Sequence, residues 1–115
     1  MTVAMTEAEL VRGLLRHFGM TPAELALATG VHARTVERWL AGDMPQRNEG
    51  RQRLHRLAAL RDRLSTLIGP PDRVRAWLRA DSRYLGGLSP LDALRAGRID
   101  RVEAAVEALA SGIFL

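Results

Sequence analysis

The chain has 115 residues, of which 47% are hydrophobic and 26% charged, with a formal net charge of +4 at pH 7. This composition is typical of one small folded unit, and the absence of cysteine excludes disulfides, cysteine-based zinc sites and cysteine nucleophiles. No apolar run approaches the roughly 18 residues that span a bilayer, and the first residues lack the layout of a signal peptide. We therefore expect a soluble, cytoplasmic protein.

Every basic residue apart from the three histidines is an arginine, and the arginines are unevenly distributed. Residues 1–68 contain ten arginines and seven acidic residues (+3), whereas residues 69–115 contain seven and six (+1). The basic excess therefore lies in the N-terminal part and indicates an anionic partner there.

The N-terminal part predicts three helices. A capping-box pattern at Thr6-Glu7-Ala8-Glu9 begins the first, which Gly19 ends. The same pattern at Thr21-Pro22-Ala23-Glu24 begins a short second helix that runs to about Thr29. A third is expected from about Ala33 to Gly42.

A loop over residues 43–50 then leads to a long predicted helix from about Glu49 to Ile68. Its apolar side is formed by leucines: Leu54, Leu57, Leu60, Leu64 and Leu67. This side suits either the core, which we favour for most of these leucines, or a dimer contact. A Gly-Pro-Pro break at residues 69–71 follows, and we place a subdomain boundary there, between residues 1–68 and residues 69–115.

Three shorter helices are predicted after this boundary. They run from Asp72 to about Ala80, from a capping box at Ser89 to Gly97, and from about Arg98 to Ala110. We expect them to pack through these apolar residues: Trp77, Leu78, Leu85, Leu88, Leu91, Leu94, Ile99, Val102, Val106 and Leu109. Nothing alternates with the period of a strand, so the predicted fold class is all-α.

The second and third helices have the spacing of a helix-turn-helix. Two short helices at a steep angle need a small residue where they cross, here Ala26, and a turn residue that accepts positive φ, here Gly30. Val36 and Trp39 supply the shared core. This order of residues resembles the helix-turn-helix of Xre-type (Cro/repressor-like) regulators.

In such a motif the start of the third helix enters the major groove of DNA. The exposed candidates there are His32, Ala33, Arg34, Glu37 and Arg38, with Arg34 best suited to read guanine and His32 less so. Arg38, Arg47 and Arg51 are better suited to phosphates.

Two departures from the motif leave DNA binding open. Pro22 stands where such regulators commonly carry a glutamine, and Glu37 puts a negative charge on the predicted DNA-facing side. Arg34 and Glu37, three residues apart, also suit an ion pair on a solvated surface.

The C-terminal half carries a second set of motifs. They are Trp77-Leu78, the Leu-Gly-Gly-Leu turn at residues 85–88, Ser-Pro-Leu-Asp-Ala-Leu at residues 89–94 and Gly97-Arg98 before the last helix. Together with the helix-turn-helix, this combination resembles the MbcA/ParS/Xre antitoxin family over nearly the whole chain.

This resemblance implies an antitoxin of a type II toxin–antitoxin system. The partners it implies are a RES-domain toxin that degrades NAD⁺ and the operator DNA of the operon, bound by a homodimer. The implied toxin-binding residues are in the C-terminal region: Trp77, Tyr84, Leu85, Ser111, Gly112, Ile113, Phe114 and Leu115.

The apolar end, Ile113-Phe114-Leu115, has two interpretations. The resemblance favours a plug that enters the active site of the toxin after Gly112 turns the chain off the helix axis. Alternatively, Ile113 completes the apolar stripe of the last helix, and Phe114 and Leu115 fold back or contact a second copy.

No enzymatic site is predicted. His17, His32 and His55 lack metal-ligand spacing, no serine has the surroundings of a nucleophile, and the two glycines at 86 and 87 lack the spacing of a phosphate loop. We predict neither a cofactor nor a metal. The alternatives to an antitoxin are a free-standing repressor and an interaction module that has lost DNA binding.

Overall fold

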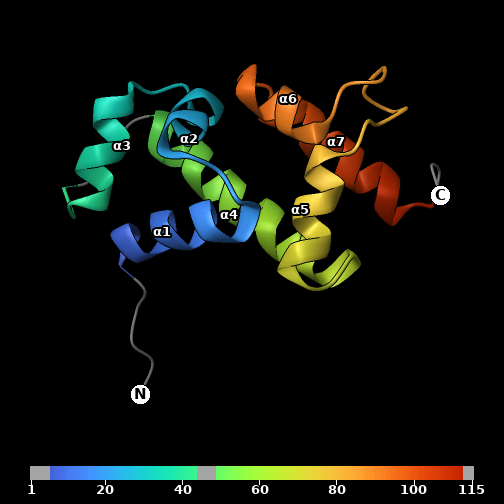
Figure 1. The fold of residues 1–115 in the computed structure, drawn as a ribbon, viewed down its shortest axis with the longest axis horizontal. Helices are drawn as coiled ribbons and strands as arrows, with labels where there is room; N and C mark the ends of the chain where they lie inside the picture. The colour runs from blue at the N-terminus through green and yellow to red at the C-terminus, as the bar shows by residue number, and fades with distance from the viewer. Residues whose placement is uncertain (1–5, 44–48, 113–115) are drawn as a thin grey trace.

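A computed structural model of the chain describes residues 6–43 and 49–112, in which helices are the only regular secondary structure (Figure 1). They are α1 (Glu7–Phe18), α2 (Pro22–Thr29), α3 (Ala33–Leu40), α4 (Glu49–Leu67), α5 (Pro71–Arg79), α6 (Pro90–Arg95) and α7 (Ile99–Ala110). The all-α prediction is confirmed for these residues, and each expected helix is found close to its predicted ends.

Two of the three predicted capping boxes form completely, those of α2 and α6. At α2 the Thr21 hydroxyl accepts from the Glu24 amide at 3.1 Å, and the Glu24 carboxylate accepts from the Thr21 amide at 3.0 Å. Ser89 and Asp92 make the same reciprocal pair at α6. At α1 only half of the predicted box is found, because Thr6 accepts from the Glu9 amide but Glu9 does not reach back.

Helix α4 lies at the centre of the molecule and packs against α1, α2, α5 and α7. Four of its five predicted leucines are buried, and Leu67 is partly buried. The core role predicted for most of these leucines is therefore confirmed. These leucines are buried in this chain's own core, so they do not form an exposed apolar side for a partner.

Buried side chains from both sides of residue 68 belong to one hydrophobic cluster. Trp39 of α3 and Phe18 of α1 share it with Val74 of α5 and Val106 of α7. Helix pairs α1–α5, α2–α6 and α4–α7 pack across the predicted boundary. The division into residues 1–68 and 69–115 stays a prediction about function.

Polar contacts also join the two parts. Arg75 and Arg79 of α5 donate to the last carbonyls of α1, with Arg79 Nη2 lying 2.7 Å from the Gly19 carbonyl oxygen. Arg95 of α6 pairs with Glu24 of α2 at 2.6 Å. Partial burial alone would raise the pKa of Glu24, but the Thr21 amide and the Arg95 guanidinium hold that pKa below its usual value.

Three predicted core positions of the C-terminal part are not fully buried in the structure, and one of them, Trp77, is partly buried. Leu88 is 53% exposed, because it lies in the loop before α6 rather than under it. Leu109 is only partly buried, while Ala105 and Ala108 of α7 are buried instead. The buried side of α7, on which α4 and α6 pack, is thus wider than the 3-4-3 stripe predicts and includes smaller residues beside it.

Candidate functional site

The turn between α2 and α3 is built as its sequence predicts. Gly30 has φ +72°, in the left-handed region, and the Val31 amide donates to the Ala26 carbonyl oxygen at 3.0 Å. Ala26, Val36 and Trp39 are buried. A side chain at position 30 would also collide with the Arg53 guanidinium, which lies against the end of α2. The turn thus fixes α3 with one side toward the core and the other toward solvent.

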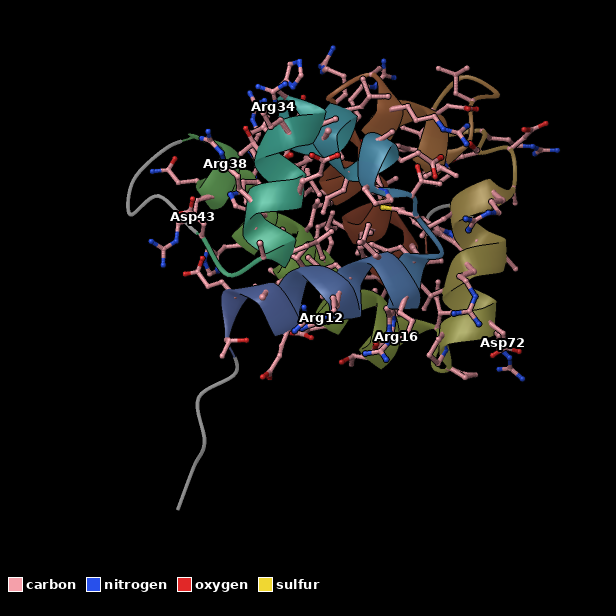
Figure 2. All side chains as sticks on the ribbon, turned by 60° about the vertical axis from the view of Figure 1, so that its left-hand side comes forward. Arg12, Arg16, Arg34, Arg38, Asp43 and Asp72 are labelled. Carbon is pink, nitrogen blue, oxygen red and sulfur yellow. The ribbon has the colours of Figure 1, made fainter. Side chains whose placement is uncertain are left out.

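The solvent side of α3 carries the residues predicted to face DNA. His32, Ala33, Arg34, Glu37 and Arg38 are all exposed, and Figure 2 shows Arg34 and Arg38 along the outer side of the helix. His32 is the N-cap of α3, and its Nδ1 accepts from the Arg34 amide at 3.2 Å. The alternative ion pair between Arg34 and Glu37 is not formed. This side therefore offers two arginines that make no ion pair within the described residues.

Two of the arginines predicted to bind phosphates, Arg51 and Arg47, lie outside α3. Arg51, at the start of α4, forms an ion pair with Glu7 of α1, and its side chain is 30% exposed. This pair compensates the charge of Arg51, and its phosphate role stays a prediction. Arg47 lies outside the described residues.

The residues predicted for toxin binding divide into core and surface. Leu85 is 2% exposed and Trp77 is half-buried against the hydrophobic cluster, so both mainly support the segment between α5 and α6. Tyr84 is 39% exposed. The large apolar side chains that this segment exposes are Tyr84 and Leu88, the second of which the sequence predicts to lie in the core.

Beside Leu88 lies an apolar hollow of about 200 Å³ between the loop, α6 and the start of α7. Its lining includes Leu85, Leu88, Ala93, Ala96, Arg98 and Arg101. Arg98 forms an ion pair with Asp100, with Nη2 and Oδ2 2.9 Å apart. The Arg98 guanidinium lowers the pKa of Asp100 to about 2. We call the exposed surface of Tyr84, Leu88 and this hollow the loop–α6 surface.

The end of α7 is described only as far as residue 112. Ser111 is the C-cap, and its hydroxyl donates to the Glu107 carbonyl oxygen at 2.9 Å. Gly112 has φ +72°, a conformation that takes the chain off the helix axis. Ile113, Phe114 and Leu115 lie outside the described residues.

One exposed apolar residue was missed altogether. Leu27 of α2 is 53% exposed, although the residues around it are buried. The helix has apolar residues on nearly all sides, so periodicity alone does not tell which of them faces solvent.

The described ranges contain no cluster of three or more His, Asp or Glu side chains able to hold a metal ion. Among the helices described, none has the length and apolar character needed to cross a membrane.

Comparisons with known proteins place the chain in a family. Residues 63–112 match the family model of the antitoxin Xre/MbcA/ParS C-terminal toxin-binding domain. The chain is 32% identical over 108 residues to the mycobacterial cidal antitoxin MbcA of Mycobacterium tuberculosis, covering 94% of this chain and 95% of that protein. It is 33% identical over 111 residues to the probable mycobacterial cidal antitoxin Rv3188, covering 95% and 92% of the two chains.

A solved structure agrees with these relatives. A chain in the crystal structure of the M. tuberculosis MbcT–MbcA toxin–antitoxin complex superposes with a TM-score of 0.68 at 31% identity, over 97% of this chain and 100% of that one. The relatives are antitoxins and not enzymes. The chain belongs to the Xre/MbcA/ParS family of antitoxins.

Proposed function

We propose that this chain is the antitoxin of a type II toxin–antitoxin pair and that its C-terminal region binds and inhibits a RES-domain toxin that degrades NAD⁺. The observation that carries the proposal is the likeness to MbcA antitoxins over nearly the whole chain, including a chain taken from a toxin–antitoxin complex. The NAD⁺ consumed by such a toxin is cytosolic, so the antitoxin acts in the cytoplasm.

The loop–α6 surface supports a protein partner on the C-terminal side. Leu88 exposes about half of its surface and Tyr84 more than a third, beside a mostly apolar hollow. Fully burying an apolar side chain of this size contributes about 1.5–3 kcal/mol to binding. A toxin that covers this surface gains that energy without any change in the antitoxin core.

The second toxin contact in this proposal is the chain end. Gly112 turns the chain away from α7, and the three residues after it are all large and apolar. The tail enters the catalytic cleft of the toxin and blocks it by burying these apolar side chains there. If the tail instead only completes the antitoxin core, its deletion lowers stability and leaves inhibition of the folded protein intact.

Growth of bacteria that express the toxin tests this function. The toxin is taken from the open reading frame beside the antitoxin gene and induced with or without the full-length chain. We expect the chain to restore growth, and Leu88→Asp to restore it less. The proposal fails if growth stays arrested although the chain is soluble and abundant. A neighbouring gene that encodes no toxin favours a free-standing repressor.

A second activity, binding of operator DNA as a homodimer, is favoured by the outer side of α3. Arg34 and Arg38 are exposed there without an ion-pair partner within the described residues, and the sharp turn at Gly30 fixes α3 with this side toward solvent. Pairing two copies doubles the contacts on a palindromic site. Figure 1 shows α3 and the end of α7 at opposite ends of the molecule, so DNA and toxin do not compete for one surface.

A mobility-shift assay with a duplex that carries the chain's own promoter tests the DNA activity. We expect a salt-sensitive shift that Arg34→Ala weakens. No shift, with or without the toxin, identifies an interaction module that has lost DNA binding, in keeping with Pro22 and Glu37.

A further inference from the structure

A cavity of about 510 Å³ opens between the end of α1, the last turns of α4 and the start of α5. Its lining is Gly13, Arg16, His17, Arg61, Ser65, Pro71 and Arg75. We call it the arginine hollow. No acidic side chain is among these residues, and neither the antitoxin role nor the DNA role uses them.

The arginines of this hollow differ from the others on α4 in their partners. Arg56 pairs with Glu103 and Arg63 with Glu107, so the α4–α7 surface is nearly neutral. In the hollow, the acidic partner of Arg61 among the described residues is its neighbour Asp62, whose side chain is 75% exposed, while the Arg61 side chain is 19% exposed. Positive charge is therefore concentrated on one side of α4.

Arg16 and Arg75 have no acidic partner within 4 Å among residues 6–43 and 49–112. Arg75 Nη1 donates to the Arg16 and His17 carbonyl oxygens at 3.2 and 3.5 Å, which fixes its guanidinium at the edge of the hollow. A guanidinium has five N–H groups, so most of those on Arg75 stay available. The site is thus partly preorganised before any ligand arrives.

The remaining polar groups of the hollow suit an anion as well. Ser65 Oγ lies 3.5 Å from His17 Nε2, and a hydroxyl and an imidazole both donate to oxyanions. Burial, followed by the Arg61 and Arg75 charges, lowers the pKa of His17, and Asp62 opposes this only partly. The potential felt by His17 is therefore positive. Asp72, in the first turn of α5, is exposed and forms no ion pair with a described residue.

We propose that the arginine hollow binds a small anion of the phosphate class, with Arg16, Arg61 and Arg75 as its charged contacts and Ser65 and His17 as further donors. Arginine pairs with phosphate oxygens through parallel hydrogen bonds, which favours phosphate over a simple halide. A cavity of this volume lies within the range of small-molecule sites, about 300–1,000 Å³, so it accepts a phosphorylated metabolite as well as free phosphate.

Figure 2 places Arg16 at the far end of α1 from the α3 side chains Arg34 and Arg38. Arg16, at the hollow, is therefore apart from the side of α3 predicted to contact DNA. This geometry favours a free phosphorylated molecule over a phosphate of the DNA backbone.

Titration of the isotope-labelled full-length chain with pyrophosphate, followed by ¹H–¹⁵N NMR at constant ionic strength, tests the proposal. We expect saturable shifts of the amides of Gly13, Arg16, His17 and Ser65, and none for Arg34. Chloride at the same ionic strength should not reproduce them. Absence of saturable shifts at the hollow with millimolar pyrophosphate overturns the proposal.

Two variants and a matched control make the test specific. Arg16→Gln removes an exposed charge and should weaken pyrophosphate binding about tenfold or more. Gly13→Leu keeps the helix and fills the space beside Arg61 Nη1, which lies 3.7 Å from the position of an added Cβ, so it should abolish binding.

Arg101→Gln changes the net charge by the same amount as Arg16→Gln, but on another surface, and should bind pyrophosphate normally. Equal losses for Arg16→Gln and Arg101→Gln show diffuse attraction and contradict the site.

Adding the promoter duplex distinguishes a free phosphate ligand from a phosphate of the DNA backbone. Displacement of pyrophosphate by DNA, together with weaker DNA binding by Arg16→Gln, assigns the hollow to the DNA backbone and overturns the proposal. Unchanged DNA binding by Arg16→Gln supports a separate ligand.

The pH dependence of sulfate binding adds a further readout, since sulfate does not titrate near neutrality. The groups that face His17 are Arg16, Arg61, Arg75, Asp62 and Ser65. A bound anion favours the protonated imidazole, so sulfate affinity should rise as pH falls into the range below the usual histidine pKa in which His17 takes up its proton. His17→Gln should remove this rise and keep the weaker binding found at high pH. A rise that persists in His17→Gln excludes His17 from the site.

Discussion

The outer side of α3 and the loop–α6 surface lie on the same small core and differ in chemistry. On α3 the exposed residues are polar, charged or small, and both large apolar residues of the helix interior, Val36 and Trp39, are buried. On the loop–α6 surface a leucine and a tyrosine are exposed beside an apolar hollow. The first arrangement suits a hydrated, anionic partner and the second suits an apolar protein surface.

The two surfaces are joined rather than separate. One hydrophobic cluster extends beneath both, and α5 and α6 hold α1 and α2 through arginines. A change in the core should therefore impair both activities together, whereas a change on one surface should impair one activity alone.

The largest effect is expected for Trp39→Ala. Trp39 is fully buried, and removing such a side chain costs about 3–5 kcal/mol of the free energy of unfolding. Chemical denaturation, followed by the fluorescence of Trp77, measures the loss. Both DNA binding and toxin binding should fall with the folded fraction.

If the Trp39→Ala variant binds the toxin fully although its N-terminal part is unfolded, the two parts of the chain fold independently and the shared-core account is wrong. Trp39→Phe is the control, since it keeps most of the buried volume and should bind both partners.

A smaller effect is expected for Leu88→Asp, which places a charge on the loop–α6 surface. Covering the Leu88 side chain in the complex contributes at most about 1.5–3 kcal/mol, so its loss lowers toxin affinity by at most about tenfold to hundredfold. Titration calorimetry with the toxin measures it. DNA binding and stability should not change, because Leu88 is exposed.

Leu27→Asp is matched in residue type and exposure but lies on α2, outside residues 63–112. It should leave toxin affinity unchanged. Equal losses for the two substitutions contradict a specific role for the loop–α6 surface.

Arg34→Ala should affect only the other surface. Loss of one base-reading arginine costs about 1–3 kcal/mol of DNA affinity, measured by the salt-controlled mobility shift. Arg73→Ala removes an exposed arginine of α5 and serves as the control with normal DNA binding. Toxin affinity should be unchanged in both, and a loss of toxin affinity in Arg34→Ala means that the two surfaces overlap.

The smallest effect is expected for Glu24→Gln, which breaks the ion pair between α2 and α6. The pKa of Glu24 is lowered in the folded chain, so its carboxylate stabilises the fold above the unfolded pKa. This stability is lost as pH falls through the folded pKa. At neutral pH the variant should lose about 1 kcal/mol, and the difference from the wild type should vanish in acid.

Local signals in the sequence predicted the helices well. Capping hydroxyls at Thr21 and Ser89 and the turn at Gly30 act within a few residues, so sequence spacing alone is enough to find them. Prediction failed where burial depends on distant segments. Leu88 differs from Leu85 only in how the loop lies on α6, and Leu27 only in how α2 meets its neighbours.

The long-range charge arrangement was not predictable either. Glu24 and Arg95 are 71 residues apart, and the arginine hollow draws side chains from three helices. Arginines at positions 16, 61 and 75 have no common spacing, because only the packing of α1, α4 and α5 brings them together. The charge difference between the two halves indicated an anionic partner and gave no information on where the unpaired charge lies.

The consumption of NAD⁺ by the purified RES-domain toxin tests the central claim most directly. We predict that an equimolar amount of the full-length chain stops NAD⁺ loss and that the chain lacking residues 112–115, folded and at the same concentration, leaves part of the activity. NAD⁺ loss at an unchanged rate with an excess of the folded, full-length chain would contradict the account.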